Sequence, residues 1–198
     1  MTYQFIVKPK IMHLKNLVII CIMTVSTSFI SIKPDKSPLP VDAGPMHFHS
    51  KFLFSDSAMV AYFECENFAS EALDNYSIAT INHAFVNVLT CTKRAVVNKE
   101  DDAVTDTIYR FSNTNNVIEI YRSAENDFVF TFDVRDSLFR LAGDIKPGMT
   151  KELFSRKFYI TEAIQNKVQI ANSEGSTKFM FYFENDSLKR INSFVYLD

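Results

Sequence analysis

Apolar residues recur along this chain with two different periods, and these periods predict most of its secondary structure. Within Thr80–Cys91 they recur every three or four residues, which places Ile81, Phe85 and Leu89 on one stripe. This pattern predicts a helix whose first residue serves as the N-cap. The following segment, Lys93–Asp106, is charged and has no clear period. We interpret it as a loop or a frayed extension of the helix.

Further along the chain, apolar and polar residues alternate, which predicts strands with one buried face. Turn-forming Asn, Asp, Ser and Gly residues separate several of these segments. In the third segment we assign Phe128, Phe130, Phe132 and Val134 to the buried face. The predicted strands are Thr107–Ser112, Val117–Arg122, Phe128–Val134, Lys167–Ala171, Lys178–Phe183 and Leu188–Leu197.

The order of these elements suggests a duplication. Pro147 and Gly148 break the chain, and Thr150 can cap a short helix that ends near Phe158. A helix followed by three strands therefore occurs twice, over residues 77–136 and 144–198. We predict an α+β fold in which helices pack on one face of an antiparallel sheet, as a tandem repeat. The alternative is one α+β domain whose element order repeats by coincidence.

The N-terminal region is typical of a secretory signal. Three lysines precede an apolar run over residues 17–30, and small residues close the run. We predict a cleavable signal peptide over residues 1–31, with cleavage after Ser28 or Ser31. A proline-rich extended tether over residues 32–45 follows, and the folded part begins at Met46. The expected location is therefore outside the cytoplasm, either periplasmic or secreted.

Two other interpretations of this region stay open. The run could serve as an uncleaved membrane anchor, although it is shorter than the ~20 apolar residues that span a bilayer. Cys21 could be the acylated residue of a lipoprotein, but Ile20 stands where a small residue is required.

Removal of the signal leaves one pair of cysteines, Cys65 and Cys91. An even number of cysteines in an exported chain favours a disulfide, and we predict one between these two residues. Two buried free thiols are the alternative, because a cysteine also packs as a small apolar residue.

Two stretches resemble a known family. Asp144–Phe154 is similar to the I-x-x-G-M-T-x-E helix entry, and Phe181–Ile191 to the F-x-N-D-x-L-x-x-I hairpin, of the β-lactamase-inhibitor-like fold. The outer-membrane assembly lipoproteins (SmpA/OmlA) share that pattern. The resemblance covers about the last 55 residues. It implies an exported α+β module, often in tandem, that binds other proteins and catalyses no reaction. The first predicted unit departs from it, because Ala79–Ile81 stands in place of Gly-Met-Thr.

Composition and motifs indicate no catalytic chemistry. The net charge is −2 and none of the four glycines lies in a phosphate-binding pattern. We therefore predict no enzyme, no cofactor and no nucleic-acid partner. His47 and His49 could share a metal ion on one strand face, but no further ligand stands at suitable spacing, so an exposed pair without metal is favoured.

One feature predicts a binding surface. If Phe179, Phe181 and Phe183 face the helices, the residues between them point outward. Tyrosine and methionine on an open sheet face suit a protein interface. The alternative is that the N-terminal strand or the loop after Cys91 covers this face. The predicted partner-binding residues are Tyr121, Met180, Tyr182 and Tyr196.

These observations favour a non-enzymatic protein–protein interaction module of the cell envelope. Two other functions remain open. One is a small-molecule-binding or hydrolytic protein with a cavity on the sheet, lined by His47, His49 or His83. The other is a structural envelope component without a soluble partner.

Overall fold

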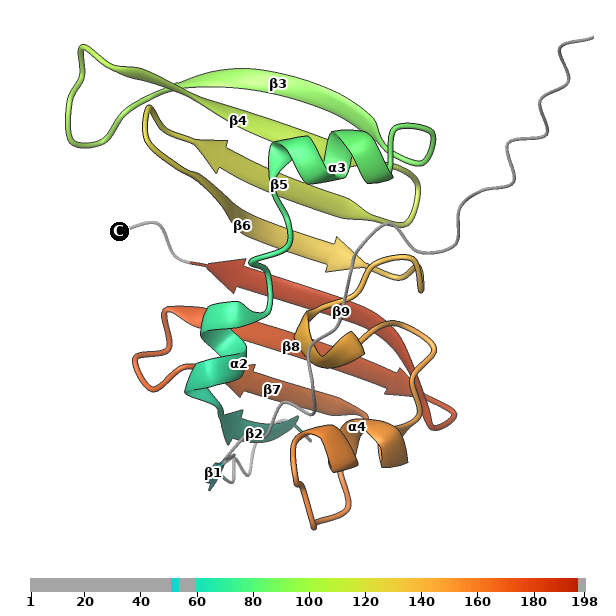
Figure 1. Cartoon of the computed structure of the whole chain (residues 1–198). Coiled ribbons are helices and arrows are strands. Elements are labelled where there is room, and N and C mark those ends of the chain that lie inside the picture. The colour runs from blue at the N-terminus through green and yellow to red at the C-terminus, as the bar shows by residue number, and fades with distance from the viewer. Residues whose placement is uncertain (1–50, 54–59, 196–198) are drawn as a thin grey trace, which may run out of the picture. The chain divides into compact units, whose positions relative to one another are not determined.

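A computed structural model describes residues 51–53 and 60–195, all of which belong to one compact unit, Ser37–Asp198. The described residues form a single nine-stranded sheet in the order β1-β2-β7-β8-β9-β6-β5-β4-β3 (Figure 1). Within it, β2 and β7 are parallel and the other neighbouring pairs are antiparallel.

The elements follow one another along the chain as short helices between runs of strands. The strands are β1 Lys51–Leu53, β2 Val60–Glu64, β3 Thr90–Val97, β4 Thr105–Ser112, β5 Val117–Arg122, β6 Asp127–Val134, β7 Lys167–Ala171, β8 Thr177–Glu184 and β9 Ser187–Val195. The helices are α2 Glu66–Glu71, α3 Ile78–Ala84 and α4 Lys151–Lys157, with one 3₁₀ turn, η1, at Ala142–Asp144.

The hydrophobic core lies on the face of the sheet that carries the short helices (Figure 1). Phe68 of α2 packs edge-on against Phe179 of β8, with ring centroids 5.1 Å apart. Phe154 of α4 lies 4.8 Å from Phe181 of the same strand. Tyr76, between α2 and α3, contacts Phe132 of β6 at 5.0 Å. Aromatic contacts therefore join both halves of the sheet to the same apolar layer.

A strand is present at each of the six predicted positions, and two have the predicted bounds, Val117–Arg122 and Lys167–Ala171. The last two residues of the predicted strand Leu188–Leu197 lie outside the described residues. Prediction works here because each strand has one apolar face, so its side-chain period is visible in the sequence.

The residues around the predicted short helix also behave as expected. Gly148 has φ +94°, a left-handed value that favours glycine, and Met149 is buried. The Thr150 hydroxyl accepts a hydrogen bond from the Leu153 amide at 3.2 Å and caps α4. Leu188 is fully buried. The chain therefore re-enters the core directly after the turn between β8 and β9.

The predicted fold class is wrong. The structure is mainly one large mixed sheet, and its helices span only six or seven residues. Two observations exclude an antiparallel sheet with a helix-plus-three-strand repeat. β2 inserts beside β7 in parallel, and the first group of strands contains four members, β3–β6. The strand pattern alone did not reveal a parallel partner from an earlier part of the chain.

The predicted helix over Thr80–Cys91 is also wrong in extent. Helix α3 ends at Ala84, and Ser77 is its N-cap, accepting a hydrogen bond from the Thr80 amide at 3.1 Å. Ile81, Phe85 and Leu89 are nevertheless all buried. A turn continues the apolar stripe, so the helical period persists beyond the helix.

The predicted loop Lys93–Asp106 is in fact most of a hairpin. β3 begins at Thr90, and all but one of its residues are exposed. An exposed edge strand needs no apolar face, which is why it carries no alternation in the sequence. The charged residues of this exposed strand therefore led to its assignment as a loop.

In β6 the predicted buried face is partly wrong. A β-bulge interrupts the register between Glu119 and Ile120 of β5. As a result Val129, rather than Phe130, is buried together with Phe132 and Val134. A bulge changes the side-chain phase of one strand, and the alternation in the sequence did not show where it lies.

Candidate binding surface on the outer sheet face

The face of the sheet opposite the helices, called the outer face here, carries three of the predicted contact residues. Met180 pairs with Asn192 across β8 and β9, and Asn192 pairs with Asp133 across β9 and β6. Directly paired residues share a face, so these side chains lie opposite the buried Phe181.

Tyr182 follows Met180 by two positions and shares its face, and Tyr121 alternates with the buried Ile120 on β5. Tyr121 is three strands away from β8, or about 14 Å. The three residues therefore share a face without forming one cluster. Tyr196 lies outside the described residues.

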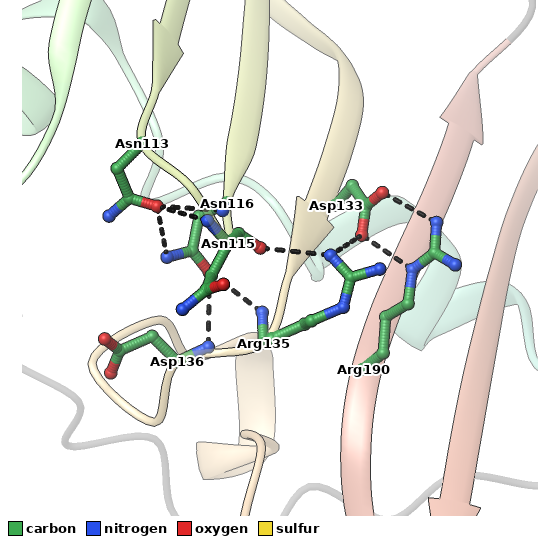
Figure 2. A network of polar contacts seen from close by, with 7 residues as sticks. All are labelled: Asn113, Asn115, Asn116, Asp133, Arg135, Asp136 and Arg190. Atoms are coloured by element: carbon green, nitrogen blue, oxygen red, sulfur yellow. Dashed lines mark hydrogen bonds and ion pairs between the residues drawn. The ribbon is translucent and has the colours of Figure 1, made fainter.

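A charged array occupies the centre of the outer face. Arg190 of β9 donates to both carboxylate oxygens of Asp133 of β6, at 2.8 and 2.7 Å (Figure 2). The same guanidinium lies 5.2 Å from the centre of the Tyr182 ring. The hydrogen bond to Asp133 raises the pKa of Arg190, so the side chain stays cationic. Tyr182 is thus held in place by a cation that is itself fixed.

A buried asparagine supports this array at the end of β6. Asn116 is 1% exposed, and its Oδ1 accepts hydrogen bonds from the amides of Arg135 and Asp136 at 2.8 and 3.2 Å. Its Nδ2 donates to Asn113 Oδ1 at 3.0 Å (Figure 2). Arg135 in turn lies 4.0 Å from Asp133. The turn between β4 and β5 is therefore tied to the strand that carries Asp133.

The most exposed apolar side chain on the outer face is Phe194 of β9, at 56%. It stands between Thr131 of β6 and Lys178 of β8. Within the described ranges no helix lies on this side of the sheet (Figure 1). A large aromatic ring thus faces solvent on the same face as Tyr182 and Arg190, four residues or about 13 Å along β9 from Arg190.

A cavity of about 520 Å³ lies at the β3 end of the outer face. Arg94, Ile108, Tyr121 and Phe128 are among the residues that line it. It combines apolar surface with a guanidinium and a phenol, a mixture suited to a small polar-headed ligand.

Tyr121 is fixed by a buried carboxylate at this cavity. Its hydroxyl donates to Asp106, which is 3% exposed, and Asn98 Nδ2 donates to the same carboxylate oxygen at 2.6 Å. The hydrogen bond to Asp106 raises the pKa of Tyr121. The phenol is therefore neutral at physiological pH and its donor is occupied, which argues against a role as a general acid.

The predicted disulfide is not formed, because Cys65 and Cys91 are both free thiols. Cys65 is buried at the N-cap of α2, next to β2, whereas Cys91 is exposed on β3. β2 lies near one edge of the sheet and β3 forms the other. This separation excludes a bond between them without a large rearrangement. Burial raises the pKa of the Cys65 thiol, which therefore stays protonated.

The histidines do not assemble a site in the described part of the chain. His83 is exposed on α3 and does not line the outer-face cavity. His47 and His49 lie outside the described residues. Within residues 60–195, no group of three or more histidine, cysteine or acidic side chains is placed to bind a metal ion.

Comparison of the chain with family models, curated proteins and solved structures found no match. None of the helices in the described ranges combines the length and apolarity that crossing a membrane requires.

Sequence reasoning missed four residues of this surface: Arg94, Asp106, Arg190 and Phe194. Arg190 and Phe194 could have been found, because both stand at outward positions of a strand that was predicted correctly. Arg94 and Asp106 could not, because the segment that holds them was interpreted as a loop.

Proposed function

We propose that this protein is an exported, non-enzymatic binding module that contacts a partner protein through the outer face of its sheet. The observation that carries the proposal is that one face presents both the exposed ring of Phe194 and the fixed Tyr182–Arg190 pair, which lies about 13 Å away along the strands. Aromatic residues and arginine are enriched in the cores of protein interfaces, and tyrosine and arginine are enriched among the residues that contribute most of the binding energy.

The arrangement of the face favours a protein over a small molecule. Tyr182 and Arg190 are already ordered by Asp133, so binding would cost little further side-chain entropy. Arg110 and Glu119, paired at 2.8 Å on β4 and β5, extend the polar surface towards β3. A broad face with one apolar ring and a polar surround resembles the rim-and-core organisation of interfaces.

The export half of the proposal depends on the N-terminal sequence. Residues 1–31 carry the features of a signal peptide, and the last 55 residues resemble a family of exported binding modules. N-terminal sequencing of protein recovered outside the cytoplasm tests this half. A mature chain that starts at Phe29 or Ile32 is expected, and an intact Met1 in the cytosol would contradict it.

Site-specific photo-crosslinking tests the binding half. A photoreactive phenylalanine analogue at position 194 should give a discrete adduct in cells that express the full chain. The matched control is position 86, because Val86 is 68% exposed but follows α3 on the helix side.

A second substitution decides whether the adduct reports the outer face. Tyr182→Asp should abolish the adduct from position 194 while the circular dichroism spectrum stays unchanged. Equal adducts from both positions, or an adduct that survives Tyr182→Asp, would refute the outer face as the contact.

The outer-face cavity favours a second candidate function, the binding of a small molecule. Its volume of about 520 Å³ falls within the range of ligand sites, and Ile108 and Phe128 provide apolar walls. NMR titration with small aromatic carboxylates tests it. We expect saturable chemical-shift changes confined to the amides of the residues around Tyr121. Chemical-shift changes spread over the whole protein, or none at all, would eliminate this candidate.

A further inference from the structure

The strand β3 forms a long open edge of the sheet. It is the last strand in the sheet order, spans eight residues and contains no proline. Among the described residues only β4 pairs with it. About half of its backbone N–H and C=O groups therefore point away from β4, towards the free edge. The opposite edge of the sheet, β1, spans only three residues.

All the charged side chains of this edge are positive. β3 contains Lys93 and Arg94 and no acidic residue. Adjacent strand residues point to opposite faces, so each face of the edge carries one cation. Lys93 lies 4.9 Å from the centre of the Tyr109 ring on the helix side, and Arg94 lines the outer-face cavity. The side chain of Arg94, unlike its backbone, makes no hydrogen bond or ion pair with the described residues.

Self-pairing of this strand is electrostatically unfavourable. An antiparallel pair of two β3 strands that uses the full eight residues places Lys93 directly opposite Arg94 of the second copy, twice. Like charges directly opposite each other destabilise a strand pair. The same two cations discourage aggregation of the free edge but attract a strand of opposite charge.

We propose that β3 binds an extended segment of an acidic partner protein by β-strand addition, with carboxylates opposite Lys93 and Arg94. Backbone hydrogen bonds along the edge supply affinity, and the two cations select the sequence. The proposal shares with the proposed function only the premise that the protein binds other proteins. It uses the edge of the sheet and shares one residue with the outer face, Arg94, which lines the cavity of the second candidate function and is not part of the Phe194 and Tyr182–Arg190 surface.

A designed peptide tests strand addition on the full chain. The probe is an acetylated and amidated octapeptide of Thr and Val with two adjacent central glutamates, and the control peptide replaces both glutamates with lysine. NMR titration should shift the β3 amide resonances with the acidic peptide. The lysine peptide should bind at least 10-fold more weakly. Equal affinity of the two peptides, or no binding of the acidic one, would overturn the proposal.

A charge swap in the protein provides the reciprocal test. Lys93→Glu combined with Arg94→Glu should reverse the preference, so that the lysine peptide binds at least 10-fold more tightly than the acidic one. The matched control, Arg156→Glu with Lys189→Glu, makes the same change in net charge at exposed positions outside β3. A reversal in the control as well would reduce the effect to nonspecific electrostatic attraction.

Backbone methylation distinguishes strand addition from attraction between side chains. Alternate backbone N–H groups of an added strand point towards β3, and the others point away from it. N-methylation of the first set should abolish binding, whereas N-methylation of the second set should leave the dissociation constant within threefold of that of the unmethylated peptide. Tolerance of both sets would overturn strand addition. Slow hydrogen exchange of every β3 amide in the free chain would overturn it too, because another segment of the chain would then occupy the edge.

Failure of strand addition at β3 and failure of the proposed function give different results. A peptide that fails to bind, together with a position-194 adduct that Tyr182→Asp abolishes, would leave the outer face as the binding surface and exclude the edge.

Discussion

At the scale of single residues, the core contains one polar group whose hydrogen-bonding capacity is not used. Ser193 is fully buried on β9, and its hydroxyl is the only buried side-chain oxygen or nitrogen in the described ranges without a hydrogen-bond partner. It faces Phe132 and Phe179 across the neighbouring strands. An unsatisfied hydroxyl among phenylalanines lowers stability, because burial removes its water without replacing it.

We therefore expect Ser193→Ala to raise the free energy of unfolding by about 1 kcal/mol. Chemical denaturation followed by circular dichroism measures the change. Ser193→Thr serves as the control, since it keeps the hydroxyl and adds a methyl group to a packed layer, and it should not stabilise. A loss of stability in the alanine variant would mean that the hydroxyl has a partner in solution.

A second residue-scale feature is the phenol of Tyr76. Its oxygen accepts a hydrogen bond from the Arg140 amide at 2.9 Å and donates to the Arg140 carbonyl at 3.0 Å. Burial raises the pKa of Tyr76 well above its ordinary value. The folded state therefore keeps this proton at a pH where the unfolded chain releases it.

The stabilisation that follows is fully present below about pH 10 and is lost as pH rises towards the folded-state pKa. Tyr76→Phe should lower the free energy of unfolding by about 1–3 kcal/mol at neutral pH, since two backbone groups lose their partner. Above pH 10 the difference between wild type and variant should shrink. Denaturant midpoints at pH 7, 9 and 11 test this, and a difference that does not change with pH would contradict it.

At the scale of elements, the turn between β4 and β5 is held by the side chain of Asn116. Two of its hydrogen bonds join the turn to the backbone after β6, and the third closes the turn onto Asn113. Asn116→Ala removes the acceptor for two backbone amides, and we expect a loss of about 2–3 kcal/mol in the free energy of unfolding.

The neighbouring residue supplies the control for that prediction. The side chain of Asn115 is exposed, and the hydrogen bonds of this residue involve only its backbone. Asn115→Ala should therefore change stability by less than about 0.5 kcal/mol. Thermal unfolding of both variants gives the comparison. Similar losses would show that the turn depends on local propensity rather than on the buried amide.

The longer elements with an apolar face could be predicted from the sequence, whereas the exposed strand β3 and the short elements β2 and α2 were missed, although β2 and α2 have buried apolar residues. Phe179, Phe181 and Phe183 reveal β8 at once, whereas exposed β3 shows no alternation. The helix α3 was overextended because a turn carries Leu89 onto the same apolar stripe. Local pattern thus identifies which side chains are buried better than it identifies where a helix ends.

The candidate site could be predicted only in part, for a related reason. Tyr182 and Met180 follow from strand alternation, since they lie between buried phenylalanines. The contact between Arg190 and Asp133 does not, because it joins residues 57 positions apart whose strands meet only in the folded sheet. Pairing order across a sheet is a property of the whole chain, not of any segment.

At the scale of the whole unit, β6 and β9 join two groups of strands. Four register pairs connect them, from Thr131–Phe194 to Val134–Ile191, and the Asp133–Arg190 pair spans the same junction. On the helix face, Phe132 lies at this junction, is fully buried and contacts Tyr76. The apolar layer is therefore continuous from one group of strands to the other.

Because the core crosses this junction, we expect the described unit to unfold in one cooperative step rather than as two repeats. Phe132→Ala should lower the free energy of unfolding by about 3–5 kcal/mol, as large cavities in packed cores do. The free energy of opening of the most protected amides should fall by the same amount in β5 and in β8, which lie on opposite sides of the junction. Native-state hydrogen exchange with residue resolution measures both. A variant whose β5 amides lose protection while those of β8 keep theirs would show that the two groups of strands fold independently, despite their shared sheet.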